Sequence, residues 1–476
     1  MSAAAFGGER RKWWTLAAVS FGLFMIMLDN TVVNVALPSI QRDLGATLSE
    51  LQWIVAGYAL TFAALMLIGG KAADAYGRRL VFVLGIVVFT LASLACGLAD
   101  SEGMLIGARV VQGAGAALMN PATLSIIAAT FPPRERGAAI GIWAGVSALA
   151  LAIGPLVGGL LTEHLSWHWI FFVNVPIGVV GIVASYLLID ESRDETHERL
   201  DLPGLFTSAL GLFALTYGLI EANTYGWGST RIVGSFVIAV AALAAFVVLE
   251  RTQRAPMLPL DLFRSGTFTG SNVVVLLVAL AMFGVFFFVS LYMQDILGYS
   301  AVQAGAAFLP MTVLIILAAP IAGKASDRFG SRWLMTVGMV ILAVQLAYFS
   351  QLGQDASYLE LLPAMLIGGL GMALTMTPSA AAATRSVPVH KAGVGSAVLN
   401  AFRQVGGSVG IALIGAIMAA EAGGRRTVEA FMDGFETSLL VAAGIALAGA
   451  VVAFVFVRPH EREREDRRAE APELAA

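Results

Sequence analysis

Fourteen apolar runs, each near the length that crosses a bilayer, constrain the fold of this chain more than any other feature. A membrane-spanning helix needs about 20 apolar residues. Only helices and closed barrels satisfy backbone hydrogen bonds in lipid, and the runs lack the alternation of barrel strands. The chain has 58% hydrophobic and 13% charged residues, whereas soluble proteins have about 25% charged residues. We therefore predict an all-α polytopic membrane protein with spans at 14–36, 51–70, 80–99, 103–124, 138–161, 169–189, 203–221, 232–249, 272–293, 305–323, 333–351, 358–383, 392–420 and 435–457.

A repeated segment divides the chain into two halves. GKAADAYGRR at 70–79 returns as GKASDRFGSR at 323–332, and a Gly-x-Gly pair at 113–115 returns at 369–371. Parallel repeats of this kind occur in membrane transporters. We expect two six-helix bundles at residues 1–190 and 266–457. Two inserted central helices are expected at 191–265, and a cytoplasmic tail at 458–476.

The basic residues of the loops predict the orientation. With the amino terminus in the cytoplasm, most loop Lys and Arg residues fall on the cytoplasmic side, as the positive-inside rule requires. The even number of spans then returns the carboxyl terminus to the same side. We expect a multi-pass protein of the bacterial plasma (inner) membrane with both termini cytoplasmic. The first span is expected to stay uncleaved, because Asp29 interrupts it.

An acid and a base lie inside these runs, where an isolated charge is unfavourable. At 1.5 Å per helical residue, Asp29 lies roughly 13 Å and Arg109 about 9 Å below the expected outer ends of their spans. We expect the two side chains to face the interior of the first bundle and to interact directly or through water, Asn30 or Asn34. Burial disfavours an ionised carboxylate and a nearby cation favours it, so Asp29 could carry a proton. A purely structural ion pair is the alternative.

Other polar and bulky residues are candidates for a substrate cavity between the halves. Arg403 lies about eleven residues into its span, so it must face protein or water. It could contact anionic substrate groups or hold helices together. Large aromatic residues of the span 272–293 could line an apolar pocket. The predicted cavity residues are Asn34, Tyr58, Gln112, Phe286, Tyr292 and Arg403.

The repeated loops and one glycine-rich span carry further signals. Glycines in the loops allow tight turns, and the carboxylates can cap a helix or bind nearby arginines, which predicts a charge lock that gates the cytoplasmic face. In the span 138–161, small residues allow close helix contact and a proline permits bending. The predicted gating residues are Asp74, Gly77, Arg78, Asp327, Arg328 and Gly330, and the glycine-rich motif consists of Gly154, Pro155, Gly158 and Gly159.

Several classes of function lack their sequence signals. The chain has no GxxxxGK[ST] nucleotide loop and no His/Cys cluster with metal spacing. Its loops are too short to hold a soluble catalytic domain. We therefore expect no enzyme activity, no cofactor, no metal site and no nucleic-acid partner. The expected partners are a small amphipathic substrate, protons and the lipid bilayer, and the expected state is a monomer.

The motifs resemble those of a known family. The segments 70–79, 105–115 (LIGARVVQGAG) and 154–159 (GPLVGG) resemble three signatures of drug-exporting members of the major facilitator superfamily. The segment 28–38 (LDNTVVNVALP) is similar to the first-span signature of the fourteen-span drug:proton antiporters. Two segments of the second half, 292–300 (YMQDILGYS) and 403–407 (RQVGG), resemble the same subfamily.

The resemblance implies the major facilitator fold and proton-coupled export by alternating access. It assigns proton coupling to Asp29 and Arg109, the gate to Asp74 and Arg78, and an antiporter-type helix to Gly154 and Pro155. The sequence departs from the family at two positions where an arginine is usual, Ala75 and His168. Some relatives that handle divalent cations carry an extra acid in the tenth span, and the segment 306–323 has none.

The residues and the resemblance together predict a proton-coupled antiporter that exports amphipathic drugs or toxic compounds. We expect these compounds to be cationic. A cationic substrate that approaches Asp29 would favour its ionised form and so expel the proton. One alternative is a dedicated exporter of a single metabolite or self-made antibiotic. Another is a non-transporting membrane receptor on the same scaffold.

Overall fold

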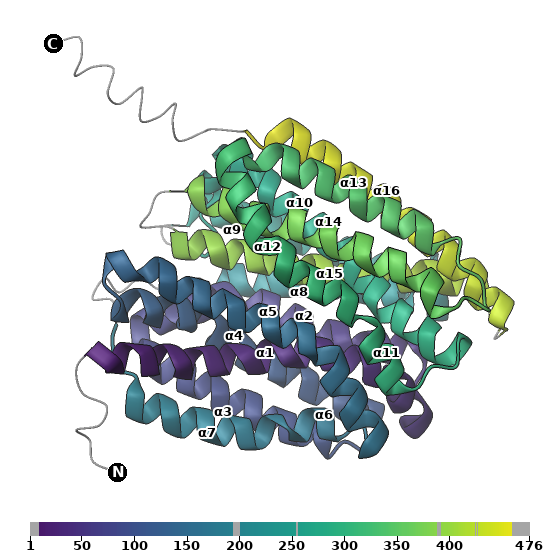
Figure 1. Ribbon diagram of the computed structural model, residues 1–476, viewed down its shortest axis with the longest axis horizontal. Helices are drawn as coiled ribbons and strands as arrows, with labels where there is room; N and C mark the ends of the chain where they lie inside the picture. The colour runs from purple at the N-terminus through teal and green to yellow at the C-terminus, as the bar shows by residue number, and fades with distance from the viewer. Residues whose placement is uncertain are drawn as a thin grey trace, which may run out of the picture.

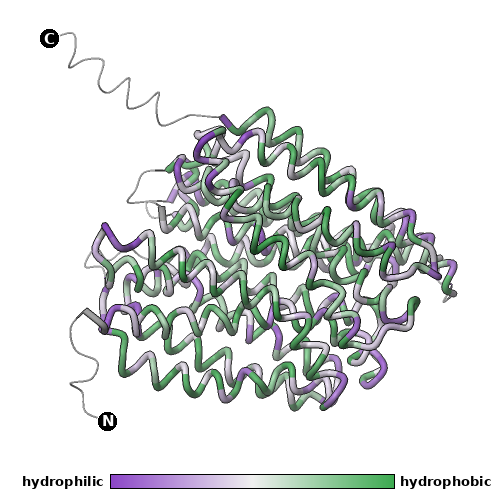
Figure 2. The backbone as a smooth tube through the Cα atoms, viewed as in Figure 1, coloured by the Kyte–Doolittle hydropathy of each residue, from purple (hydrophilic) through white to green (hydrophobic). Residues whose placement is uncertain are grey.

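The computed structural model describes residues 9–193, 200–253, 256–387, 392–423, 425 and 427–458. Within these residues the chain is helical and contains no strand. Fourteen helical segments are long and apolar enough to cross a membrane, which confirms the predicted number of spans. Hydrophobic residues follow the middle of the helices and hydrophilic residues gather at their ends (Figure 2). Apart from residue 458, the predicted tail lies outside the described residues.

The first six spans form one bundle, drawn in purple and blue in Figure 1. The first helix runs on past Pro38 to Leu44, although a proline donates no backbone hydrogen bond. The sixth span is divided into two helices at Val173. The helices of this bundle are α1 (Glu9–Leu44), α2 (Leu48–Tyr76), α3 (Arg78–Gly97), α4 (Glu102–Thr130), α5 (Pro133–His164), α6 (Trp169–Phe172) and α7 (Asn174–Leu188).

The last six spans form the second bundle, drawn in teal, green and yellow (Figure 1). A short 3-10 turn, η2 (Leu260–Arg264), precedes it, and a π-helical turn, η3 (Tyr292–Ile296), ends its first span. Its helices are α10 (Gly266–Leu291), α11 (Ala301–Ala307), α12 (Leu309–Phe329), α13 (Ser331–Phe349), α14 (Tyr358–Arg385), α15 (Ala392–Ala422) and α16 (Val428–Phe456). The exact boundaries between the predicted domains stay a prediction.

Both halves place their helix ends in the same way. We call the end at which α1 begins and α16 ends the terminal end, at the left of Figure 1, and the opposite end the distal end. At the distal end, Thr47 and Ser357 each form a reciprocal capping box, with Glu50 and Glu360 respectively. At the terminal end, the repeated loops turn at Gly77 (φ 124°) and Gly330 (φ 81°), backbone conformations that glycine adopts without strain.

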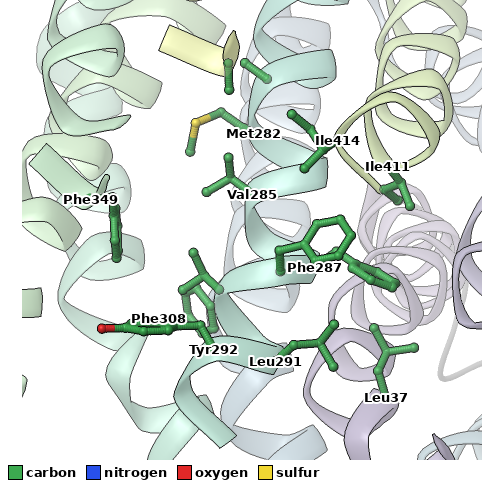
Figure 3. Packing of buried hydrophobic residues seen from close by; sticks show 14 of the residues in the cluster. Leu37, Met282, Val285, Phe287, Leu291, Tyr292, Phe308, Phe349, Ile411 and Ile414 are labelled. Carbon is green, nitrogen blue, oxygen red and sulfur yellow. The ribbon is translucent and has the colours of Figure 1, made fainter. Parts of the chain in front are cut away.

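A continuous hydrophobic core joins the two bundles at the distal end. One cluster of buried side chains includes Leu37 and Ile54 of the first bundle together with Phe287, Leu291 and Ile411 of the second. Figure 3 shows Leu37 beside Leu291. Three hydrogen bonds between the bundles within the described residues lie in the same region: Gln52 Nε2 to Ile411 O (2.7 Å), Gln294 Nε2 to Val35 O (2.9 Å) and Val302 N to Glu163 Oε2 (2.9 Å). The bundles are therefore closed against each other at this end.

The two inserted helices, α8 (Leu202–Tyr225) and α9 (Thr230–Thr252), form a hairpin beside the bundles. Helix α8 packs against α2 of the first bundle and α15 of the second, so it covers one edge of the interface between the bundles. We call this interface the seam. Near the distal end, Trp53 Nε1 donates to Glu221 Oε1 (3.2 Å) and Asn223 Nδ2 donates to Ala416 O (2.7 Å). The insertion is thus attached to both halves at once.

Removing one of these attachments should weaken the folded state. We expect Asn223→Ala to lower the free energy of unfolding by about 1 kcal/mol, since interhelical hydrogen bonds in membranes are worth roughly 0.6–2 kcal/mol. Thermal unfolding in detergent measures the change. Thr252→Ala is the matched control, because that hydroxyl bonds only to carbonyls of its own helix. Trp227→Phe is the second control, because Asn223 Oδ1 also accepts a hydrogen bond from Trp227 Nε1 (3.1 Å) and Asn223→Ala removes that bond too. Equal Tm values for Asn223→Ala and Thr252→Ala would show that the contact with α15 contributes nothing.

Candidate functional site

The centre of the first bundle holds a buried ion pair. Asp29 on α1 and Arg109 on α4 contact each other directly, through Oδ2 and Nη1. Their side chains are 0% and 1% exposed, so both charges are removed from bulk water. Neither predicted asparagine bridges them: Asn30 donates to Ile26 O of its own helix (2.8 Å), and Asn34 is only half-buried. Among the arrangements that the sequence left open, the direct contact is the one present.

Gln112 completes this pair instead of lining a cavity. It lies one turn after Arg109 on α4 and is fully buried. Its Nε2 donates to Asp29 Oδ1 (2.9 Å) and to Ser93 Oγ (2.7 Å), while its Oε1 accepts from Arg109 Nη1 (2.6 Å). Because it bonds to both members of the pair, it fixes their mutual orientation. We call Asp29, Arg109 and Gln112 the buried charge network.

Two further contacts make the network more complete than the sequence suggested. Asn174 on α7 donates from Nδ2 to Asp29 Oδ1 (3.4 Å), and Arg109 Nε donates to Ile54 O (3.1 Å). Asn174 and Ser93 were not among the predicted site residues. The available signal was that each is a polar residue inside an apolar run. Asp29 therefore accepts from Arg109, Gln112 and Asn174 together, the partners that a buried charge requires.

Arg109 also reaches the seam between the bundles. Its guanidinium lies over the ring of Tyr58, 4.2 Å from the centroid. Beyond Tyr58 lies an enclosed gap of ≈ 10 Å³, the space of about one water molecule. The gap is lined by both halves: Asn30, Val33, Val55, Tyr58, Ala59 and Arg109 of the first bundle, and Phe283, Gln404, Gly407 and Ile411 of the second. Arg109 thus connects the buried acid to the surface between the bundles.

The other predicted cavity residues are placed differently. Phe286 packs edge-to-face on Phe308 (5.7 Å), within the second bundle. Tyr292 is fully buried in that bundle, where its hydroxyl donates to Gly353 O (2.5 Å) and its ring stacks on Phe435 (5.0 Å). It therefore does not line the gap. Arg403 on α15 is half-buried and does not itself line the gap, although Gln404, the next residue, and Gly407, one turn later, do.

The repeated loops form charge pairs inside their own bundles. In the first loop Asp74 pairs with Arg78 (2.8 Å), one turn later on the chain. In the second loop Asp327 pairs with Arg385 of α14 (2.6 Å) and not with Arg328. Arg328 lies instead over the ring of Phe329, 5.2 Å from its centroid. These ion pairs do not cross between the bundles in this conformation, and the gating role of the loops stays a prediction.

The glycine-rich motif of α5 allows two kinds of close approach. A Cβ added at Gly154 or Gly158 would meet α1, at Thr31 and at Val32 O (2.7 Å) respectively. A Cβ at Gly159 would collide with Ala301 O at the start of α11, and the carbonyl of Pro155 occupies the space that a Cβ on Gly305 would need. The motif therefore holds α5 against its own bundle on one face and against the second bundle on the other.

Comparison with known proteins places this arrangement in a family. The sequence model described as Major Facilitator Superfamily matches residues 19–411 and again 272–475. The puromycin resistance protein of Streptomyces alboniger is 38% identical over 96% of this chain and 93% of its own length. The tetracenomycin C resistance and export protein of Streptomyces glaucescens is 36% identical over 94% of this chain and 82% of its own length.

Further relatives and a solved structure agree. The multidrug resistance protein Stp of Mycobacterium tuberculosis is 35% identical over 87% of this chain and 77% of its own length. A bacterial homologue of the human lysosomal transporter Spinster, in an inward-facing and unoccupied conformation, superposes with a TM-score of 0.67 at 19% identity, over 95% of this chain and 98% of that one. The fold is therefore that of a membrane transporter and not of an enzyme. This chain belongs to the Major Facilitator Superfamily, among relatives that are drug and antibiotic resistance and export proteins.

Proposed function

We propose that this chain exports amphipathic small molecules in exchange for protons, with Asp29 as the proton-binding group and Arg109 as its charge partner. The single observation that carries this proposal is the position of Arg109. It is bonded to the buried acid on one side and lines the gap between the bundles on the other. A change in the protonation of Asp29 would therefore change the position or the charge balance of Arg109 at the surface where the two bundles meet.

The energetics of the pair support a link between protonation and conformation. A proton on Asp29 would leave Arg109 as a buried cation without its anion, and breaking a buried pair in this way costs ~3–5 kcal/mol. A different packing of α1 and α4 that readmits water or another acceptor would relieve that penalty. Proton entry can thus favour one conformation over another by several kcal/mol. A charge that crosses 100 mV supplies about 2.3 kcal/mol, which is enough to bias such an equilibrium.

Alternating access would then open the distal end. Export requires that the hydrogen bonds of Gln52, Gln294 and Glu163 across the seam break in the outward-open form. Residues 1–190 and 266–457 would move as the two rocking domains, and residues 191–265 would follow as the insertion. We propose that the loops around Asp74 and Asp327 form the gate at the terminal end when it closes. The predicted cationic charge of the cargo is not part of this proposal, because Arg109 already neutralises Asp29 here.

We also propose the setting in which this transport takes place. The distribution of Lys and Arg in the loops supports a bacterial inner membrane, with the terminal end facing the cytoplasm. One chain carries both bundles and the seam between them, so a monomer is sufficient for the mechanism. The terminal end is then the side from which cargo enters.

The proton gradient provides the direct test. Everted membrane vesicles that contain this protein should accumulate ethidium, puromycin or fluorescein when respiration generates a gradient. Nigericin, which exchanges protons for potassium, should abolish the accumulation when valinomycin and potassium are also present to remove the membrane potential, whereas vesicles without the protein should show none. Accumulation that persists under these conditions would contradict proton coupling.

The names of the relatives favour a second candidate, an exporter dedicated to one antibiotic. Two of the similar proteins are named for a single compound, puromycin or tetracenomycin C. The same vesicles separate the two candidates when a panel of both antibiotics and unrelated dyes is tested. Broad accumulation across the panel supports multidrug export, and accumulation of one compound alone supports the dedicated exporter.

A further inference from the structure

Arg403 is a cation in the protein interior without a counter-charge. It lies near the middle of α15 and is half-buried. Among the described residues it forms no ion pair and no hydrogen bond, and its Nε is buried without a partner. An unpaired guanidinium at such a depth is strongly unfavourable unless it serves a ligand or a water-filled space. The packing of α15 leaves this one charge unsatisfied.

Two neighbouring donors are unsatisfied in the same place. The hydroxyl of Tyr58 on α2 and the Nε2 of Gln404 on α15 are both buried without a hydrogen-bond partner in the protein. Both side chains line the gap between the bundles, and Arg403 directly precedes Gln404 on α15. The seam thus presents a guanidinium, a hydroxyl and an amide from the two facing helices. All three groups can donate a hydrogen bond.

The acid in this region is not available to a ligand. Asp29 already accepts hydrogen bonds from Arg109, Gln112 and Asn174, and its pair with Arg109 is neutral as a whole. No carboxylate lines the gap itself. Arg403 adjoins the gap through its neighbour Gln404, so the uncompensated charge beside the gap is the positive charge of Arg403. A cationic cargo would meet repulsion there, whereas an anionic one would meet three donors.

We propose that Arg403, together with Tyr58 and Gln404, binds an acidic or strongly hydrogen-bond-accepting group of the cargo, such as a carboxylate or a phenolate. This inference rests on the proposed function, because it assigns a substrate class to the same seam. Arg403 supplies charge and Tyr58 and Gln404 supply orientation. The amphipathic remainder of the cargo would lie against apolar neighbours such as Phe283 and Ile411. The phosphate of a lipid headgroup shares this chemistry and is the other source to be distinguished.

Binding of two matched dyes to the purified full-length protein tests the proposal without a proton gradient. Fluorescein is an anion, and tetramethylrhodamine methyl ester is a cation built on the same ring system. Fluorescence anisotropy in detergent at fixed pH should show that Arg403→Gln weakens fluorescein binding by about tenfold or more, as expected for loss of a charged hydrogen bond. Binding of the cationic ester should stay equal or become tighter. Arg403→Lys should recover part of the fluorescein affinity.

Controls make each outcome decisive. Arg231→Gln removes an exposed arginine on α9 and should change neither dye, and gel filtration shows whether each variant is folded. Equal weakening of both dyes, unchanged fluorescein binding, or wild-type binding of the ester alone would overturn the assignment. So would displacement of fluorescein from the wild-type protein by phosphatidylglycerol in mixed detergent micelles but not by a soluble carboxylate such as benzoate, because the site would then belong to lipid. If the wild-type protein bound neither dye, the proposed multidrug export would be wrong. If accumulation in vesicles did not depend on the proton gradient, only the proposed proton coupling would be wrong.

Discussion

Asp29→Asn should abolish proton-driven export while cargo exchange continues. The asparagine keeps the shape of the side chain, but it carries no charge and cannot bind a proton at neutral pH. Arg109 then has no anionic partner in either conformation of the transport cycle, and a buried unpaired charge costs ~3–5 kcal/mol. The protonation state can no longer choose between conformations. Uphill accumulation in everted vesicles should fall by roughly 100-fold or more, which is what an energy of this size corresponds to.

Exchange of labelled for unlabelled cargo across proteoliposomes separates coupling from folding. That exchange needs the conformational change but no net proton movement, so we expect it to survive in Asp29→Asn. Asp100→Asn is the matched control, because Asp100 is an exposed acid in the loop between α3 and α4. It should leave both assays unchanged. Retention of nigericin-sensitive uphill transport by Asp29→Asn would refute the role assigned to Asp29.

The contact between Asp29 and Arg109 could be anticipated from the sequence because helix geometry fixes depth. A rise of 1.5 Å per residue places any residue within its span once the span ends are known. Two opposite charges at similar depth in an apolar bundle have few other partners. The fourteen spans follow from the same kind of physics, since apolar length alone decides whether a helix can cross a membrane.

The direction in which each side chain points around its helix could not be anticipated in the same way. Tyr292 was expected to line the cavity, but it lies inside the second bundle against Phe435, because neighbouring aromatic residues on one helix point in different directions. Gln112 was expected at the cavity wall and joins the ion pair instead. Asn174, on a helix far along the chain, also donates a hydrogen bond to Asp29. These positions depend on how whole helices rotate against each other.

Long-range ion pairs are equally hidden in the sequence. Asp74 binds Arg78 of its own loop, and for Asp327 the sequence predicted either a helix cap or a bond to a nearby arginine. Its partner is Arg385 at the end of α14, which the fold brings alongside. The unsatisfied state of Arg403 is also a property of packing alone. A mid-span arginine is visible in the sequence, but the lack of a hydrogen-bond partner for its buried Nε becomes visible only in three dimensions.

Gly159→Ala should hold the distal end of the transporter open. The added Cβ would collide with the carbonyl oxygen of Ala301, a backbone atom that can move only if α5 and α11 separate. Overpacking of this kind costs ~1–3 kcal/mol. Because the contact exists only when the distal end is closed, the whole penalty falls on the closed conformation. The equilibrium between closed and open forms should shift by about 5–150-fold.

Labelling of a cysteine at the distal seam measures this shift. In a Val302→Cys background, a membrane-impermeant maleimide should react faster when Gly159→Ala is present, and export should slow in proportion. Native Cys96 is buried and does not compete for the reagent. Gly145→Ala is the control on the same helix, because a Cβ there meets no atom within 4 Å. If both alanine variants label and transport like the parent, the Gly159 contact does not close the transporter. If Gly159→Ala alone slows export without faster labelling, its effect lies within the first bundle and not at the seam.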